Sequence, residues 1–416
     1  MKRLLFVCAL LEAVAVSAAN VIEATVAEGV AGVTDISYEI SGDAPKVVTM
    51  EVLTNGVSAG ASGVRHTFGD VWKLVRPGAH KIAWRADRDL APEVYEAGDF
   101  KVTLTAWETN CPPDYLVVDL VRTNFTYYPS VDHLVKEGDA LSRVYATCFW
   151  VFRKIPAALR WFPLGNPTDA GNQRDVMLSE DYYIAIYETT DGQNHWMRDH
   201  RTGTAYPVSN SYNGWRGTSF YWPAEKHQLG GVLQAYRDAT GLEVDMPTEA
   251  QWEIAARGDD FSHTLYNGTN MVTTTETVDG KSYVLAPMLD EIGWVGWNST
   301  NETGACAVHE VGLKKPNAYG LYDVIGNFWE YCREYNWAYQ TAPTVDPTCA
   351  PKADCSSSTQ FVRRGGSYNQ SPVNAMLVSR SVPQRDWSND GGGSIDGSGH
   401  KENHGLRAVC PAVAVK

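Results

Sequence analysis

Four short stretches of this chain stand out: MPTEAQWEIAARG at 246–258, NAYGLYDVIGNFWEYC at 317–332, VRRGGSY at 362–368 and GLRAV at 405–409. The first predicts a helix from Glu249 to Arg257, because Thr248 and Gln251 match a capping box and Gly258 can end the helix. The apolar residues of this helix would share one face, so we expect it to serve packing.

Taken together, the four stretches resemble the formylglycine-generating enzyme, or sulfatase-modifying factor, family over residues 146–411. The resemblance implies a C-type-lectin-like fold of mixed α+β type with much irregular loop. It also implies that Trp329, Ser367 and Tyr368 line a ligand pocket. Relatives have two cysteines, two and seven residues after the tyrosine of GGSY, where this chain has Gln370 and Ala375.

The two missing cysteines decide which chemistry we expect of this pocket. In relatives their thiolates hold copper(I), an ion that favours soft sulfur ligands, and activate oxygen there. The amide of Gln370 and the methyl group of Ala375 cannot replace sulfur. We therefore expect no copper and no copper-dependent cysteine oxidation, and we assign no catalytic residue.

The resemblance further implies a structural calcium site formed by Asp323, Gly326, Phe328 and Glu330. Two carboxylates and two backbone carbonyls are hard oxygen donors of the kind that calcium takes, with water completing the shell. In the alternative interpretation, Asp323 and Glu330 accept hydrogen bonds from backbone amides and hold the loop without an ion.

Residues 1–19 predict a secretory signal peptide, with Lys2 and Arg3 before an apolar run and Ser17 to Ala19 as a small-residue cleavage site. The protein is therefore expected to be secreted, periplasmic or at the cell surface. No later stretch approaches the roughly 20 apolar residues of a membrane span. A net charge of −14 argues against nucleic-acid partners, because phosphate binding needs clustered Lys and Arg.

Residues 20–128 alternate apolar and polar positions in short runs separated by turn residues. This pattern predicts an antiparallel β-sandwich of the immunoglobulin or fibronectin kind. We expect residues 129–145 to form a linker and residues 146–411 to form the second domain. The predicted strands are Val21 to Val26, Asp35 to Ile40, Val47 to Leu53, Lys81 to Ala86 and Phe100 to Trp107, and a second helix is predicted from Gln228 to Thr240.

Seven cysteines follow the leader, and export permits disulfides. Cys349 and Cys355 enclose a short loop and are the easiest local pair, although two unpaired thiols are the alternative. Relatives have a disulfide whose two positions are Ala256 and Ala408 here. Cys332 and Cys410 could pair in its place.

The remaining polar clusters favour loops over metal sites. His195 and His200, with Asp199 between them, are five residues apart and so do not share a helix face. His400 and His404 lie in a Gly/Ser-rich stretch. Each group has too few ligands for zinc. Sequons at 124, 267, 298 and 301 indicate exposed loops.

Our leading functional interpretation is an exported ligand-binding protein of this family whose pocket takes a peptide, protein or glycan. An active oxidoreductase with a non-standard site, using Cys306 or Cys332, is the second interpretation, and a structural surface protein is the third. Aromatic side chains could form the binding platform or lie in the core: Trp215, Trp222, Trp329, Tyr368 and Trp387.

Overall fold

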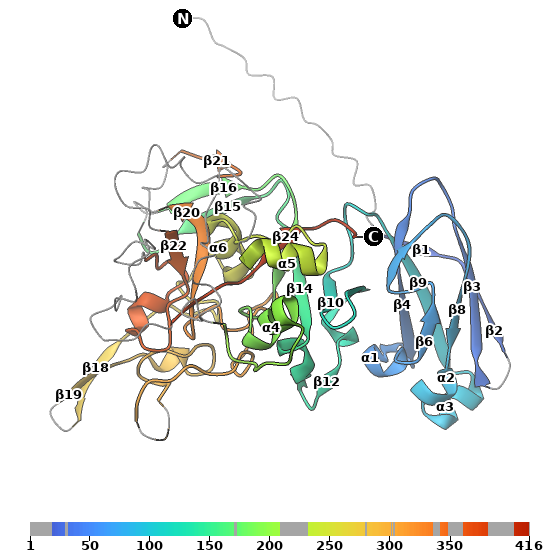
Figure 1. Cartoon of the computed structure of the whole chain (residues 1–416), viewed down its shortest axis with the longest axis horizontal. Coiled ribbons are helices and arrows are strands. Elements are labelled where there is room, and N and C mark those ends of the chain that lie inside the picture. The colour runs from blue at the N-terminus through green and yellow to red at the C-terminus, as the bar shows by residue number, and fades with distance from the viewer. Residues whose placement is uncertain are drawn as a thin grey trace, which may run out of the picture. The chain divides into compact units, whose positions relative to one another are not determined.

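The structure is a computed structural model, and it describes residues 19–29, 32–169, 173–208, 232–278, 281–300, 302, 304–335, 342–347, 361–381 and 403–415. These residues divide into two compact units. Unit 1 holds residues up to 112 except 60–62, and unit 2 holds residues 60–62 and 113–415 (Figure 1). Each unit is described by itself below.

Unit 1 consists of two antiparallel sheets, as the alternating sequence predicts. One sheet has the order β1 (Ala19–Ile22), β9 (Phe100–Trp107), β4 (Lys46–Thr54), β5 (Val57–Ser58), with β7 (Lys73–Val75) also pairing with β4. The other has the order β2 (Ala24–Glu28), β3 (Thr34–Ile40), β8 (Gly78–Trp84), β6 (Thr67–Gly69). Alternate side chains such as Ile36, Met50 and Ile82 are fully buried, which gives the unit its apolar core. Three short helices complete the first part of the chain: α1 (Gly60–Gly63), α2 (Ala86–Asp89) and α3 (Pro92–Ala97).

The boundary between the units lies earlier than the sequence predicts. Strands β10 (Tyr115–Asp119) and β11 (Asn124–Tyr128), expected to end the sandwich, belong to unit 2. The reason is strand pairing, because all five residues of β10 pair with β14 (Phe149–Ile155). The complete sheet has the order β11, β10, β14, β17 (Tyr182–Ala185), β24 (Val409–Pro411).

The predicted linker at 129–145 is also part of unit 2. It holds η2 (Val131–His133), the pair β12 (Lys136–Glu137) and β13 (Ala140–Leu141), and the start of η3 (Arg143–Ala146). The side chains of Leu134, Leu141 and Tyr145 are buried in the main apolar core. This segment therefore packs as structure and does not act as a spacer.

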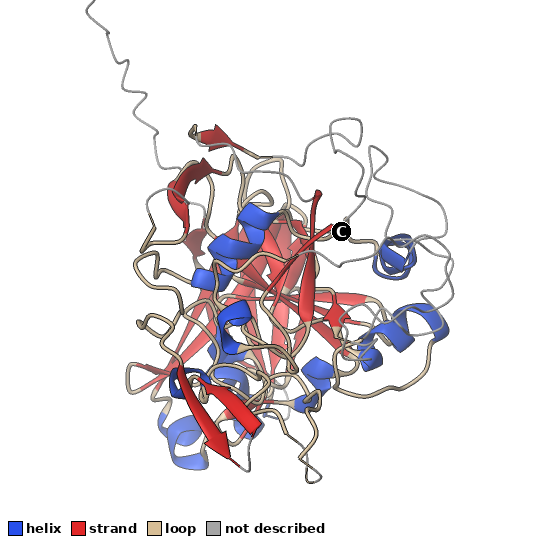
Figure 2. Ribbon diagram, turned by 90° about the vertical axis from the view of Figure 1, so that its left-hand side faces the viewer, coloured by secondary structure: helices blue, strands red, loops and turns tan. Residues whose placement is uncertain are grey.

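Irregular loop and small sheets make up the rest of unit 2, as the loops in Figure 2 show. The unit is thus rich in strands, with few helices among the described residues. It contains more strand and less helix than the predicted α+β class implies. Two small sheets have the orders β15 (Trp161–Gly165), β16 (Gln173–Met177), β21 (Thr344–Val345) and β22 (Phe361–Arg364), β20 (Trp329–Tyr335), β23 (His404–Gly405). A hairpin joins β18 (Thr274–Val278) to β19 (Lys281–Leu285), and the helical segments are α4 (Asp191–Asp199), α5 (Val232–Thr240), α6 (Glu249–Arg257), η5 (Pro287–Leu289) and η7 (Pro372–Ala375).

Both predicted helices are present. Helix α6 has the predicted bounds, and both hydrogen bonds of the capping box between Thr248 and Gln251 are formed. Helix α5 covers Val232–Thr240, whereas residues 228–231 of the prediction lie outside the described residues. Helix α4 was not predicted, and the polar loop expected around His195 is wrong because that residue lies within this helix.

Among the described residues, no helix combines the length and apolar character that crossing a membrane requires.

Candidate functional site

The strand β20 brings three of the four sequence stretches together. It pairs antiparallel with β22, so that Glu330 lies opposite Arg364 and Tyr331 opposite Arg363. It also pairs parallel with β23, where Trp329 lies opposite His404. Residues separated by up to 75 positions therefore meet at the start of one strand, which is where the resemblance places the pocket.

Two glycines make this convergence possible. Gly326 has φ 78°, and a Cβ there would lie 1.9 Å from the carbonyl oxygen of Trp294. Gly366 has φ 80°, and a Cβ there would lie 2.8 Å from Ala375. A side chain at either position would force the loops apart, so both positions require glycine.

Ser367 lies at the centre of a neutral hydrogen-bond network with Asn369 and Asn403, which we call the Ser367 cluster. The Ser367 hydroxyl donates to Asn369 Oδ1 at 3.0 Å and accepts from Asn403 Nδ2 at 3.1 Å. Asn403 Nδ2 also donates to Asn369 Oδ1 at 2.9 Å. Because none of these groups titrates near neutral pH, the cluster offers hydrogen bonds and no acid, base or redox centre.

Trp329 lies beside this cluster and is almost completely buried. Its backbone N–H donates to the carbonyl of Asn403, and the guanidinium of Arg363 stands 4.6 Å from the centre of its ring. Its indole N–H and the Nδ2 of Asn369 are both buried donors that find no acceptor within the described part of the chain. Buried donors normally have partners, so these two are candidates for binding an acceptor group of a ligand.

The positions of the missing cysteines are filled by a backbone contact and by packing. The carbonyl of Gln370 accepts from the N–H of Gly296 at 2.9 Å, and its side-chain oxygen accepts from Asn374. Ala375 is fully buried at the end of η7. The thiol of Cys306 donates to the carbonyl of the same Gly296, so it is connected to position 370 through one residue.

Asp323 and Glu330 belong to a buried group of three carboxylates and one guanidinium. Both oxygens of Glu330 accept from Arg407, at 2.6 to 3.0 Å, and one also accepts from the indole N–H of Trp252 at 2.6 Å. Arg407 further donates to the carbonyls of Ala185, Ile186 and Tyr322. It therefore ties the start of β20 to the end of β17.

Glu188 is the third carboxylate of this group. It accepts from the backbone N–H of Phe328 and from Asn327 Nδ2, each at 2.8 Å. Asp323 accepts from the N–H of Gly312 at 2.7 Å, while its other oxygen is buried and has no donor in the described ranges. Burial raises the pKa of Glu188 well above its usual value and raises the pKa of Asp323 to about 6.

Sequence reasoning missed Glu188 and Arg407. Arg407 lies in the closing GLRAV stretch, so a carboxylate partner for it could have been sought in the Asp323 stretch. Glu188 gives no such signal, because its partner Phe328 is 140 residues away along the chain.

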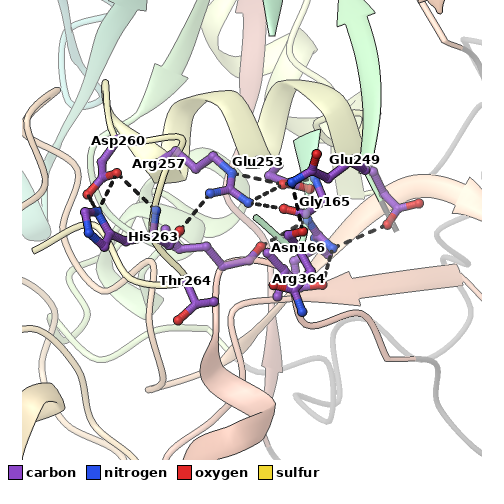
Figure 3. Close-up of polar contacts among 12 residues, drawn as sticks. Gly165, Asn166, Glu249, Glu253, Arg257, Asp260, His263, Thr264 and Arg364 are labelled. Atoms are coloured by element: carbon purple, nitrogen blue, oxygen red, sulfur yellow. Dashed lines mark hydrogen bonds and ion pairs between the residues drawn. The ribbon is translucent and has the colours of Figure 1, made fainter. Parts of the chain in front are cut away.

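Helix α6 joins this region to β15 through a buried ionic network (Figure 3). Glu253 accepts from Arg257, at 2.9 and 3.0 Å, from Arg364 and from the N–H of Gly165. Burial alone would raise the pKa of Glu253, but Arg364, Arg257 and Arg174 outweigh it and lower that pKa to about 2. Glu253 is therefore ionised and paired at every physiological pH.

The start of α6 holds a second pair of carboxylates. Glu249 pairs with Arg380, at 2.9 and 3.0 Å, and its backbone N–H donates to Glu334 at 2.8 Å. Burial, followed by the charge of Glu249, raises the pKa of Glu334 to about 8.

These pKa shifts predict an unusual pH dependence of stability. A carboxyl whose pKa is raised on folding holds its proton better in the folded state, so its contribution is lost as the pH rises. Glu334 and Asp323 act in this way. The contribution of Glu334 is lost as the pH rises from near 4 to about 8, and that of Asp323 as it rises from near 4 to about 6. Glu253 acts oppositely, and its contribution is lost below about pH 4.5, toward 2. We expect the free energy of unfolding to rise by more than about 2 kcal/mol from pH 8 to pH 5.

Thermal unfolding followed by circular dichroism across this pH range measures the effect. The variant Glu334→Gln should flatten the slope above pH 6, because it removes a carboxyl whose pKa is raised to about 8. A wild-type stability that is constant or increases toward pH 8 would contradict the prediction.

Cys332 and Cys410, the alternative pairing considered from the sequence, form no disulfide. Both thiols are free and buried, Cys332 in β20 and Cys410 in β24, which belong to different sheets. Burial raises the pKa of each thiol, so both are protonated and unreactive at neutral pH. Cys349 and Cys355 lie outside the described residues.

The histidine groups have structural contacts. His195 lies in α4 between Asp191, at 3.0 Å, and Asp199, at 3.2 Å. His404 contacts Arg363 and stacks on Tyr331, while His400 lies outside the described residues. Within the described ranges, no three His, Cys, Asp or Glu side chains form a group that could hold a metal ion.

Of the predicted aromatic platform, Trp329 and Tyr368 are buried, and Trp215, Trp222 and Trp387 lie outside the description.

Residues 162–394 match the model of the sulfatase-modifying factor enzyme 1-like domain. The chain is 32% identical over 131 residues to a formylglycine-generating enzyme of Thermomonospora curvata and 31% identical over 126 residues to that of Mus musculus. These alignments cover 31% and 30% of this chain. They span 40% and 30% of the length of those relatives.

Two solved structures align with the chain at low scores. Treponema denticola variable protein 1 has a TM-score of 0.42 and 20% identity, over 63% of this chain and 95% of that one. PvdO from Pseudomonas aeruginosa has a TM-score of 0.42 and 16% identity, over 67% of this chain and 99% of that one.

Proposed function

Because the chain belongs to the family of sulfatase-modifying factor enzyme 1-like domains, we propose that it is an exported, ligand-binding member without copper-dependent cysteine oxidation. Its unit 2 would adopt the family's C-type-lectin-like fold. The observation that supports this proposal is the chemistry at the two cysteine positions. Gln370 holds Gly296 through its backbone, and Ala375 packs against Gly366.

These residues do not fit copper(I). The ion favours thiolate ligands, and an amide and a methyl group supply none. Cys306 is the thiol connected to position 370, and it is a single sulfur engaged with a backbone carbonyl. No step of the proposed function therefore passes through copper.

The Ser367 cluster supports ligand binding in place of oxidation. The buried donors of Asn369, within the cluster, and of Trp329, beside it, have no acceptor among the described residues, so a ligand that presents a carbonyl or hydroxyl oxygen would satisfy them. Peptides and glycans both present such oxygens. Asn369 and Gln370 are only half-buried and would form the accessible edge of the site.

Copper titration separates the binding protein from an oxidoreductase. The full chain should show no stoichiometric, tight copper(I) binding and no aldehyde product from a cysteine-containing peptide. The double variant Gln370→Cys, Ala375→Cys restores both thiols and is the positive control, which should gain copper binding. Tight copper in the wild type that is lost in Cys306→Ser would overturn the proposal in favour of an enzyme with a non-standard site.

Binding itself is tested on peptide and glycan arrays. A ligand retained by the wild type should bind at least about tenfold more weakly to Asn369→Ala, because one buried hydrogen bond is lost. Asn374→Ala is the matched control, since that amide contacts Gln370 and lies outside the Ser367 cluster. Equal loss in both variants would contradict a site at the cluster, and an absence of any ligand would favour a structural surface protein.

We propose calcium for the loop from Asp323 to Glu330 on the strength of its charge balance. Three buried carboxylates face one guanidinium, so protons or a cation must neutralise the excess. The oxygen of Asp323 that has no donor fits a calcium ligand, whereas Glu330 is already paired with Arg407. Backbone carbonyls and water would have to complete the 6 to 8 ligands that calcium takes.

Calcium should therefore raise the unfolding temperature of the full chain at pH 7.5, where Asp323 is ionised, and should raise it less at pH 5. Magnesium, which demands a tighter octahedral shell, is the control ion. If calcium raises the unfolding temperatures of the wild type and of Asp323→Asn equally, the proposed calcium site at Asp323 is wrong.

A further inference from the structure

Exposed apolar side chains gather at the sheet formed by β15, β16 and β21: Trp161 in β15, Val345 in β21, and Leu159 two residues before β15. Leu159, Trp161 and Val345 are 71%, 51% and 49% exposed. Trp161 lies opposite Met177, and Met177 lies opposite Val345, so these residues form one row across the sheet. Figure 1 shows the three strands together at the upper edge of unit 2. We call this row, with Leu159, the Trp161 patch.

Leu159 is exposed and has an unfavourable backbone conformation. It has φ 58°, a left-handed conformation that is unfavourable for a branched side chain. Its N–H donates to the carbonyl of Leu178 at 2.7 Å, which fixes this conformation. Leu159 and Trp161 are both exposed, and neighbouring exposed apolar residues mark interaction sites.

The sheet that presents the patch is firmly anchored. The far end of β15 is held at Gly165, whose N–H donates to Glu253 and whose carbonyl accepts from Arg257. Phe162 and Leu164, which alternate with the exposed residues, are buried in the core. The patch is thus a rigid surface, and binding would need no ordering of this sheet.

The charged residues around the Trp161 patch indicate what charge a partner should carry. Asp175 lies on the same strand and face as Met177, and Glu180 and Asp346 are exposed beside its ends. Asp346 is held there by its N–H, which donates to the carbonyl of Met177. Arg160 is the exposed basic residue of the segment, and its guanidinium stands over the ring of Phe162. Among the described residues, the rim is therefore mainly acidic.

An exposed indole beside carboxylates is suited to a cation, because the ring face attracts positive charge and the carboxylates add to that field. A second copy of this chain is disfavoured, since each copy has a net charge of −14 and the same acidic rim. We propose that the Trp161 patch docks a partner segment in which Lys or Arg side chains alternate with apolar ones. No residue of this patch belongs to the Ser367 cluster, so this interaction is additional to the proposed ligand site.

The test uses the full chain and two capped pentapeptides, KLKLK and ELELE, with binding followed by calorimetry and by tryptophan fluorescence. KLKLK should bind, and more weakly as salt is raised, whereas ELELE should not. Trp161→Ala should weaken binding of KLKLK by about five- to thirtyfold. Asp175→Asn should weaken it by a few-fold and reduce the salt dependence.

Leu313→Ala is the matched control, because that side chain is 55% exposed in the same unit but outside the patch. Trp161→Phe keeps an aromatic ring and should bind with intermediate affinity even if Trp161→Ala fails to fold. The proposal is overturned if KLKLK does not bind, if Trp161→Ala binds it as the wild type does, or if both peptides bind equally. It is also overturned if sedimentation shows a dimer that Trp161→Ala abolishes, which would make a second copy the occupant.

Discussion

Replacing Glu253 with Gln should lower the free energy of unfolding by about 4 kcal/mol, because removing one partner of a buried ion pair leaves its counter-charges unpaired. Here two guanidinium groups, of Arg257 and Arg364, would lose their common carboxylate inside the core. Glu253 also holds the N–H of Gly165, so the link between α6 and β15 would weaken. Chemical denaturation with urea, followed by tryptophan fluorescence, measures the loss.

Glu291→Gln is the control for this variant. Glu291 also pairs with a basic residue, Lys315 at 2.7 Å, but both side chains are 68% exposed. Exposed ion pairs contribute little, so this change should cost less than about 1 kcal/mol. If the two substitutions cost the same, the buried network would not stabilise the fold as argued.

The second large effect is expected at Arg407. Arg407→Met should cost about 4 kcal/mol, since Glu330 loses its buried counter-charge and three backbone carbonyls each lose one hydrogen bond. Arg407→Lys keeps the charge but loses the planar fork, and should cost about half as much. The comparison separates the charge of the guanidinium from its geometry.

Thermal and urea unfolding of both variants measure these differences. Arg122→Lys is the control, because the Arg122 side chain that pairs with Asp119 is 72% exposed. Arg407→Met should also shift the pH dependence, since its three carboxylate neighbours would lose their cation. A Lys variant as unstable as the Met variant would mean that geometry alone matters at this position.

Local signals were read from the sequence more successfully than non-local ones. Helix α6 was predicted to its bounds because the capping box of Thr248 and Gln251 lies within the helix itself. Helix α4 carries the same signal, since Thr190 and Gln193 form a capping box, and a search for that motif would have found it.

Strand pairing explains the misplaced boundary. Residues 115–128 alternate like the strands before them, and a sequence pattern does not show which sheet a strand joins. The partner of β10 is β14, which lies after the segment taken for a linker. Likewise, the predicted pair of Cys332 and Cys410 required a distance and direction that no spacing supplies.

The candidate site was predictable as far as the family resemblance extended. Ser367, Trp329 and Asp323 were named from their motifs, and the structure brings their stretches together at β20. Asn369, Asn403 and Glu188 were not predicted, because each takes part through contacts made only in the folded chain. Asn403 precedes the closing stretch by two residues and lies 36 positions from Ser367.

The placement of β10 also governs how this protein can be cut for laboratory work. A fragment that starts at 146 would lack both β10 and β11. The edge of β14 that pairs with β10 would then be unpaired, and strands of other molecules could pair with it. A fragment that starts at 113 keeps the five strands intact. We therefore expect the fragment that starts at 146 to aggregate and the fragment that starts at 113 to stay in solution.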